Sequence, residues 1–411
     1  MDDTLKQLRA RIDTLDDELL KLLSERARLA QEVGRAKNGE MIYRPEREAQ
    51  IVRRLTDANP GPLEDETVEC LFREIMSACR ALEQDICVAY LGPAGTFSQA
   101  AVFKHFGHEI TALPEADIDA CFRSVETGRA DFAVVPVENS TEGVISRTLD
   151  LIVTSPLKIC GEVMLPIRQN LMRKLPPSPP ASGAAEGSVR SSGEPAGVPL
   201  AGAGAGGEGK RANNAGSPLP NPLPPAGEGA NVWPAPINRV YGHAQSLAQC
   251  QDWLNRHLPH AQRISVVSNS EGAQRAAQEP DAAALGSEVA AELYGLNIVA
   301  TRVEDEASNT TRFLVLAPHD AAPSGCDKTS FVMGAHNQPG AIVKLLQPLA
   351  DAGISMSKLE SRPARSANWE YLFFVVCEGH REDAKLSATL AEIGKRAAFL
   401  KILGSYPQAS L

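Results

Sequence analysis

The chain has 411 residues, of which 43% are hydrophobic and 22% charged, a composition typical of a soluble globular protein with several domains. Its net charge of −10 argues against a general affinity for nucleic acid, because phosphate binding needs a basic surface. Eight scattered cysteines without a C-x-x-C pair favour reduced thiols over disulfides or a zinc site. The N-terminus is not that of a signal peptide and no apolar run is long enough for a membrane span, so we expect a cytoplasmic protein.

The first predicted helix has an apolar seam that two cations interrupt. From Leu5 to Val33, apolar residues recur at spacings of three and four, the pattern of a helix that packs on other helices. The same rhythm requires apolar residues where the sequence has Arg26 and Lys37. A cation on such a seam is costly unless it is paired or binds a ligand. The two cations therefore indicate either an anionic ligand or buried salt bridges. A third interpretation applies to Lys37 alone, because the apolar seam can end before that residue.

Two shorter helices complete residues 1–86. One is predicted from Pro45 to about Ala58, because proline suits the first turn of a helix. The next carries apolar residues at helical spacing from Phe72 to Ile86. Three helices of such unequal length leave much of the long seam uncovered, so we expect this all-α domain to form a dimer.

Short β-rich runs alternate with helical ones over residues 87–318. This alternation predicts an α/β domain with mostly parallel sheets. The predicted strands are CVAYLG, FAVVPVEN, KICGEVMLP, NRVYGH, RISVVSN, LNIVATRV and RFLVLAP.

Residues 174–236 interrupt the α/β domain and are dominated by Pro, Gly, Ala and Ser. Such a segment has too little apolar surface to offset the entropy of ordering, so we predict a disordered insertion. It contains GAGAGG and GAGGEGK, which resemble nucleotide-binding loops. Because neither has a predicted strand before it and a helix after it, we expect no nucleotide site there.

The last segment, residues 328–411, predicts strands and helices in the order βαββαβ, which is the ferredoxin-like plan. Its predicted helices are GAIVKLLQPLADAG and DAKLSATLAEIGKRA.

The later helices of residues 1–86 add charges to the packed side of the domain. The second predicted helix supplies Arg44, Arg47 and Glu48, and the third supplies Cys79 and Glu83 one turn apart. Several cations that face few carboxylates indicate an anionic ligand.

With these residues the domain resembles the helical chorismate mutase family, in which a dimer of long helices binds a dicarboxylate. The resemblance implies a pericyclic rearrangement of chorismate to prephenate, which needs a compressed substrate and cations near the ether oxygen. It also implies roles for single residues. The substrate carboxylates would be held by Arg26, Arg47 and, across the dimer, Arg9, with Arg44 nearby. Lys37 would hold the ether oxygen, and Glu48 would accept a hydrogen bond from the substrate hydroxyl. Cys79 and Glu83 would contact the substrate at positions where relatives can have Ser and Gln.

Polar clusters follow four strands of the α/β domain, at positions where helices begin. Backbone N–H groups at helix starts, with nearby hydroxyls and amides, make a site for carboxylates, although each cluster alone can be ordinary capping. The clusters are GPAGTFSQ (92–99), VENSTEG (137–143), GHAQSLAQ (242–249) and SNSEGA (268–273).

These clusters, together with Thr311-Arg312-Phe313, resemble prephenate dehydratase, a two-lobed fold like that of periplasmic binding proteins. The resemblance implies that Thr311 donates to the departing ring hydroxyl, while Arg312 orients it or binds a carboxylate. Glu138 is the candidate for the decarboxylation half of the reaction. The substrate would be fixed by Asn139, Ser140, His243, Gln245 and Gln249. Gly242 occupies a position that is often Ser.

In the C-terminal segment, NQPGAIV and ESRP resemble the ACT module, an amino-acid sensor that binds phenylalanine between subunits. The resemblance implies effector contacts from Asn337, Gly340, Ala341, Glu360, Ser361 and Arg362. Feedback inhibition by phenylalanine would follow by linkage.

Together the resemblances imply a bifunctional chorismate mutase–prephenate dehydratase with an ACT domain, in a homodimer or larger assembly, with no metal or organic cofactor and no nucleic-acid or membrane partner. Two alternatives remain open: a ligand-sensing protein, since two-lobed domains also bind solutes, and a mutase whose dehydratase half is inactive because of Gly242 or the insertion. A mutase joined to a dehydrogenase is disfavoured, because no nucleotide-binding loop is properly placed.

Overall fold

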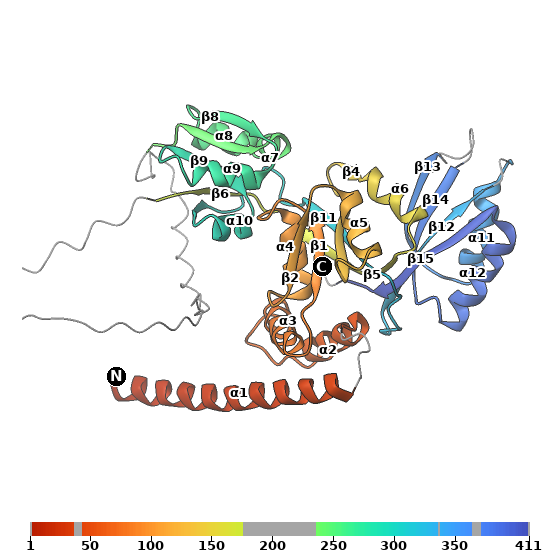
Figure 1. Cartoon of the computed structure of the whole chain (residues 1–411), viewed down its shortest axis with the longest axis horizontal. Helices are drawn as coiled ribbons and strands as arrows, with labels where there is room; N and C mark the ends of the chain where they lie inside the picture. Colours follow the sequence, from red (N-terminus) through yellow and green to blue (C-terminus); the bar gives the residue numbers. More distant parts are fainter. Residues whose placement is uncertain (1, 37–42, 176–235, 336–337, 364–370, 410–411) are drawn as a thin grey trace, which may run out of the picture.

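The computed structural model describes residues 2–36, 43–175, 236–335, 338–363 and 371–409. They form a helical domain, a two-lobed α/β domain and a C-terminal α/β domain (Figure 1). The predicted insertion at 174–236 falls almost wholly outside the described residues. Within the described part of the chain, none of the helices is both long and apolar enough to cross a membrane.

The helical domain has the three predicted helices, and only the end of the third differs from the prediction. Its elements are α1 (Asp2–Ala36), α2 (Pro45–Asp57) and α3 (Asp65–Ala81). Leu82 and Ile86 lie beyond α3, because the chain leaves the helix there to enter the first strand, and Ile86 is buried in the core of the α/β domain. Much of α1 extends past the other helices (Figure 1).

The first lobe contains a six-stranded mixed sheet. Its strands run in the order β2-β1-β3-β11-β5, with β4 paired to β3. β1 is parallel to β2 and β3, whereas β11 is antiparallel to β3 and β5, so the prediction of mostly parallel sheets is wrong. The elements are β1 (Cys87–Leu91), α4 (Phe97–Phe106), β2 (Thr111–Glu115), α5 (Ile118–Glu126), β3 (Phe132–Asn139), β4 (Gly143–Val144), α6 (Ser146–Thr154), β5 (Lys158–Pro166) and β11 (Thr310–Ala317).

The second lobe lies between β5 and β11 in the sequence, so the chain crosses between the lobes twice. Its sheet has the order β10-β6-β9-β7-β8. The crossings are hydrogen-bonded to each other, from Ile167 N to Asn309 O and from Val303 N to Gln169 O, both at 2.8 Å. The elements are β6 (Asn170–Arg173), β7 (Arg239–His243), α7 (Ala244–Gln249), α8 (Gln251–His257), β8 (Gln262–Val266), α9 (Asn269–Ala276), β9 (Ala282–Gly286), α10 (Glu288–Leu293) and β10 (Asn297–Ala300).

The C-terminal domain confirms the βαββαβ prediction. Its antiparallel sheet has the order β13-β14-β12-β15, and Val332, Phe374, Leu403 and Tyr406 from that sheet share one hydrophobic core with the first lobe. The elements are β12 (Asp327–Gly334), α11 (Ala341–Asp351), β13 (Met356–Pro363), β14 (Tyr371–Glu378), α12 (Ala384–Arg396) and β15 (Phe399–Pro407).

The helical domain docks on the end of α4 through two arginines of α3. Arg73 donates to the carbonyl of His105 at 2.9 Å, and Arg80 donates to the carbonyl of Phe106 at 2.5 Å. Cations at the last carbonyls of a helix are favoured by its dipole. The Tyr43 hydroxyl completes the contact, because it lies 2.8 Å from Nε2 of His105.

We expect this junction to weaken in acid. Burial, with smaller contributions from Arg73 and Arg80, lowers the pKa of His105 from 6.5 to about 3. A histidine with a lowered folded pKa stabilises the fold above its unfolded pKa. That stabilisation is lost as the pH falls below it, because the unfolded chain takes up the proton first. Between pH 7 and pH 5 the loss amounts to about 1–2 kcal/mol.

Replacing His105→Gln keeps an acceptor for Tyr43 and removes the titration. The variant's melting temperature should therefore fall less than that of the wild type between pH 7 and pH 5. His108→Gln is the matched control, because the His108 side chain is 62% exposed. An unchanged pH slope in the His105 variant would contradict this account.

Candidate functional sites

A cavity of about 280 Å³ lies between the two lobes of the α/β domain. All four polar clusters singled out in the sequence reach it, and so does Thr311. These stretches therefore converge on one cavity. Its polar lining includes Thr96, Ser98, Asn139, Gln169, His243, Gln245, Ser246, Gln249, Ser268, Asn269, Ser287 and Thr311.

The first lobe presents Thr311 and Asn139 side by side on paired strands. Thr311 lies opposite Asn139 in the β3–β11 register, and both side chains are buried. The amide nitrogen of Asn139 donates to the Thr311 hydroxyl at 2.8 Å and to Asn309 Oδ1 at 2.7 Å. Since Thr311 Oγ1 already accepts from Asn139, its own proton remains to be donated to a group in the cavity.

The Asn139 side chain is fully occupied by these and other contacts. Its Oδ1 accepts from the backbone and hydroxyl of Thr141 and from the backbone N–H of Glu142. Asn139 therefore fixes Thr311 and the following turn at once.

The second lobe presents hydroxyls, amides and a histidine at helix starts. Asn269 Oδ1 accepts from the backbone N–H of His243 at 2.7 Å, and Asn269 Nδ2 donates to the Ser246 hydroxyl at 2.7 Å. Ser268 caps α9 by accepting from the N–H of Glu271. These bonds hold the polar side chains in place along one wall of the cavity.

The two lobes touch beside the cavity, where Gly95 is required. The Ser287 hydroxyl donates to the Gly95 carbonyl at 3.0 Å. Gly95 has a φ of +85°, and a Cβ there would come within 3.3 Å of the Ala290 backbone. A side chain at this position would therefore be both strained and crowded.

Gly242 lies outside the residues that line the cavity. A Cβ there would meet the side chains of Leu247 at 3.2 Å and Leu285 at 3.5 Å. A serine in this backbone would face apolar groups, so the glycine removes no polar group from the cavity wall.

Three predicted site residues do not reach the cavity. Glu138 and Arg312 neighbour Asn139 and Thr311 on their strands, so their side chains point to the opposite face of the sheet. Glu138 forms an ion pair with Lys358 of β13 at 2.5 Å. Ser140 is exposed, and its hydroxyl bonds the backbone of residues 308 and 310.

Arg312 belongs to a buried charge network under the C-terminal domain. It pairs with Glu162 at 2.9 Å and donates to the Tyr406 hydroxyl at 2.9 Å. Glu162 is fully buried and also pairs with Lys328 at 2.7 Å. Burial raises the pKa of Tyr406 to about 12, so this hydroxyl keeps its proton at neutral pH. The network joins β5 and β11 to β12 and β15.

In the helical domain, Arg26 lies half-buried against α3 and donates to the Ile75 carbonyl at 3.5 Å. Among the described residues, no carboxylate forms an ion pair with Arg26. Glu83 packs closely on Gly34 of α1. A Cβ added at Gly34 would lie only 2.7 Å from Glu83 Oε2, so the contact needs a glycine there. Cys79 is buried one turn away.

The remaining predicted residues of this domain are placed differently. Glu48 pairs with Arg80, and burial raises the pKa of its carboxyl although Arg80 opposes the rise. Arg9 and Arg47 are exposed, and Arg44 lies 3.8 Å from Glu46. Lys37 lies outside the described residues. The structure thus brings Arg26, Cys79 and Glu83 to the α1–α3 contact and leaves the outer cations on the surface.

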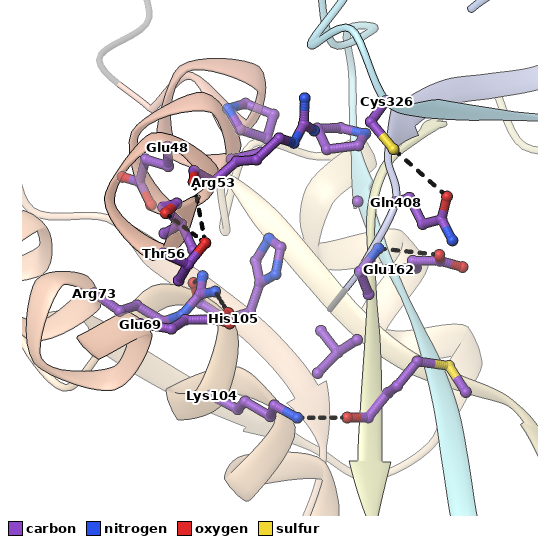
Figure 2. Close-up of a pocket in the computed structure, with 18 of the residues that line it drawn as sticks. Glu48, Arg53, Thr56, Glu69, Arg73, Lys104, His105, Glu162, Cys326 and Gln408 are labelled. Atoms are coloured by element: carbon purple, nitrogen blue, oxygen red, sulfur yellow. Dashed lines mark hydrogen bonds and ion pairs between the residues drawn. The ribbon is translucent and has the colours of Figure 1, made fainter. Parts of the chain in front are cut away.

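Glu48 also lines a second cavity, of about 420 Å³, between the helical domain, the first lobe and the C-terminal tail (Figure 2). Its charged groups are largely satisfied by the protein. Arg73 pairs with Glu69 at 2.5 Å, and Lys104 donates to the Met164 carbonyl at 2.7 Å. This larger cavity is therefore a gap at a domain junction, and Thr311 does not line it.

The predicted effector residues lie on two edges of the C-terminal domain. Gly340, with a φ of +73°, precedes Ala341 at the start of α11. On β13, Ser361 is exposed and Glu360 half-buried, while Arg362 approaches Asp150 of the first lobe at 3.4 Å. Asn337 lies outside the described residues.

Sequence analysis missed Arg80, Glu162 and Gln169. Arg80 and Arg73 lie seven residues apart and so share a face of α3, a pattern that could have revealed the docking surface. Glu162 is the one acidic residue of a strand that is otherwise apolar after Lys158, which is a usable signal of a buried ion pair. Gln169 lies in a connection between strands, where no periodicity marks it.

Comparisons with known proteins agree with this organisation. Family models match for chorismate mutase type II at residues 8–84, prephenate dehydratase at 88–178 and 229–321, and the ACT domain at 329–395. A bifunctional chorismate mutase/prephenate dehydratase of Neisseria gonorrhoeae is 46% identical over 100% of this chain and 99% of its own length. One of Pseudomonas aeruginosa is 42% identical over the same shares.

Among solved structures, a prephenate dehydratase from Arthrobacter aurescens in complex with L-Phe is 26% identical, with a TM-score of 0.59 over 79% of this chain and 90% of that one. Full-length similarity to the curated relatives and matches in all three domains lead to one conclusion. The chain belongs to the family of bifunctional chorismate mutase/prephenate dehydratases.

Proposed function

We propose that the helical domain of this chain rearranges chorismate to prephenate and that the interlobe cavity converts prephenate to phenylpyruvate. The observation that carries the second assignment is the Thr311 hydroxyl, which lines the cavity and accepts from Asn139, so that its own proton is left for a group in the cavity.

The dehydratase step is driven by aromatisation of the ring. As the ring carboxylate leaves as carbon dioxide, its bonding electrons enter the ring and the C–O bond breaks. The departing hydroxide takes a proton from Thr311 and leaves as water, and solvent returns the proton. Threonine is a weak acid, so its main contribution is a positioned hydrogen bond that strengthens as charge develops on the oxygen. His243, Gln245 and Gln249 line the wall where the substrate carboxylates would bind.

The mutase step needs no nucleophile. We assign the substrate carboxylates to Arg26 together with Arg47 and a partner's Arg9, and the ether oxygen to Lys37 and Glu83. Support comes from Arg26, a half-buried cation that contacts a carbonyl and forms no ion pair with the described carboxylates. Such a cation can receive a dianion without first breaking a salt bridge.

We further propose that a second copy of the chain covers α1. The row of Leu5, Leu8, Ile12, Leu15, Leu19, Leu22, Leu29 and Val33 is between 46% and 63% exposed. An apolar stripe about 40 Å long is far more than a soluble monomer leaves uncovered. A partner helix would also bring Arg9 toward the other chain's Arg26.

Phenylalanine is the effector that we assign to the C-terminal domain, with contacts from Gly340, Ala341, Glu360 and Ser361. The signal has a direct route to the dehydratase site. Lys358 and Arg312 hold the reverse face of the strands that carry Asn139 and Thr311. We therefore assign Glu138 and Arg312 to positioning the strands.

The proposal places the enzyme in the cytoplasm. All eight cysteines fall within the described residues and are free thiols, as expected in a reducing compartment. Activity confined to a periplasmic fraction would contradict this placement.

The function is tested by following chorismate, prephenate and phenylpyruvate with the purified chain. The wild type should form both products. Arg26→Met should lower only the mutase rate and Thr311→Val only the dehydratase rate, each by about 10²-fold or more, because one charge or one donor is removed. Thr311→Ser, which keeps the hydroxyl, is the matched control and should retain most dehydratase activity. Loss of both activities in either single variant would count against two separate sites.

The dimer is tested by sedimentation equilibrium. Leu19→Asp places a charge on the apolar row and should yield monomers that lack mutase activity but retain dehydratase activity. Ala10→Asp places the same charge on the opposite, exposed side of α1 and should leave the dimer intact. A monomeric wild type would refute the proposal.

The regulatory route is tested with Lys358→Met. Since Lys358 touches Glu138 and not the cavity, dehydratase activity without effector should stay within about twofold, while inhibition by phenylalanine should weaken severalfold. Lys395→Met is the control, because Lys395 is 75% exposed on α12. Identical inhibition curves for the wild type and Lys358→Met would rule out this route.

A further inference from the structure

Gln169 lies where the chain first crosses between the lobes, and its side chain lines the dehydratase cavity. Its backbone is fixed on both sides by the second crossing. The N–H donates to Glu304 at 2.8 Å and the carbonyl accepts from Val303 at 2.8 Å. The residue is only 1% exposed. Gln169 is thus a rigid, buried part of the hinge that forms the floor of the cleft.

The two ends of the Gln169 amide are in different situations. Nε2 donates to the Ser246 hydroxyl at 3.1 Å, and Ser246 is in turn held by Asn269. Oε1 has no hydrogen-bond partner among the described residues. Buried polar atoms are nearly always paired, so an open acceptor on a cavity wall indicates a donor that arrives with the ligand.

The chemistry of prephenate identifies that donor. This step rests on the proposed dehydratase function. Prephenate carries two carboxylates and a ketone, which only accept hydrogen bonds, and one ring hydroxyl, which is its sole donor. The amide oxygens of Asn139 and Asn269 are already occupied by protein N–H groups. An acceptor such as Gln169 Oε1 can pair with the substrate only through the ring hydroxyl.

We propose that Gln169 is a specificity-determining residue that accepts a hydrogen bond from the ring hydroxyl of prephenate, while Thr311 donates to the same oxygen. The leaving oxygen then has a donor on one side and an acceptor on the other. When the C–O bond breaks and the Thr311 proton is transferred, the hydrogen already on that oxygen stays directed at Gln169. The product water is held between the two residues.

The experiment compares two inhibitors with a saturated ring, which cannot aromatise. Both carry the carboxylates and the ketone of prephenate, but only one carries the ring hydroxyl. The wild type should bind the hydroxylated inhibitor on the order of 10-fold more tightly. Gln169→Met, of similar length but without an acceptor, should bind both about equally and show a lower dehydratase kcat/KM. Its mutase rate reports that the chain is folded.

Ser246→Ala is the matched control, because it removes the tether of Nε2 and leaves Oε1 in place. It should keep the preference for the hydroxylated inhibitor. The inference is overturned if Gln169→Met keeps that preference, or if Ser246→Ala loses it equally. A wild type that converts no prephenate would instead overturn the proposed function, so the two failures are distinguishable.

Discussion

The pairing of β3 with β11 is the constraint on which the rest of the α/β domain depends. In this register Asn139 lies opposite Thr311, and Glu138 lies opposite Arg312. Successive side chains of a strand face opposite sides of the sheet. The same strand pairing therefore directs Asn139 and Thr311 into the cavity and Glu138 and Arg312 toward the C-terminal domain. A slip of one residue would exchange the two faces and abolish both sets of contacts. The lining of the interlobe cavity and the docking of the C-terminal domain are therefore fixed by the same hydrogen bonds.

On the face of this sheet opposite the cavity, a buried ion-pair network contacts the C-terminal domain. Glu162 is fully buried between Arg312 and Lys328, and it also accepts from the backbone N–H of Ala409. Burying a carboxylate is costly, and the cost is offset only when several donors surround it. Because these donors come from β11, β12 and the chain end, the network is complete only when the C-terminal domain is docked. Such a network favours one relative arrangement of the two domains over others.

Much of the fold and most of the cleft residues follow from the sequence, and the failures have identifiable physical causes. Local periodicity predicted the long α1 and the βαββαβ order, because both depend on near neighbours. It predicted the wrong strand directions, because β11 joins its sheet only after the chain has crossed to the second lobe and returned. The resemblance assigned Glu138 and Arg312 to the same site as Asn139 and Thr311. The alternation of side chains along a strand would have assigned them to the opposite face of the sheet. Gln169 depends on a long-range crossing that leaves no local signal.

The first lobe connects the three domains, and α4 and the β3–β11 pair are its two lines of contact. The start of α4 lines the interlobe cavity, while its last carbonyls accept hydrogen bonds from Arg73 and Arg80 of the helical domain. On the other side, β11 carries Thr311 in the cavity and Arg312 in the network under β15. The helical domain thus contacts the far end of the same helix whose start lines the cavity, and the C-terminal domain contacts the same strand that carries Thr311. In a chain whose first domain makes the substrate of its second, this arrangement places the first lobe between the helical domain and the C-terminal domain.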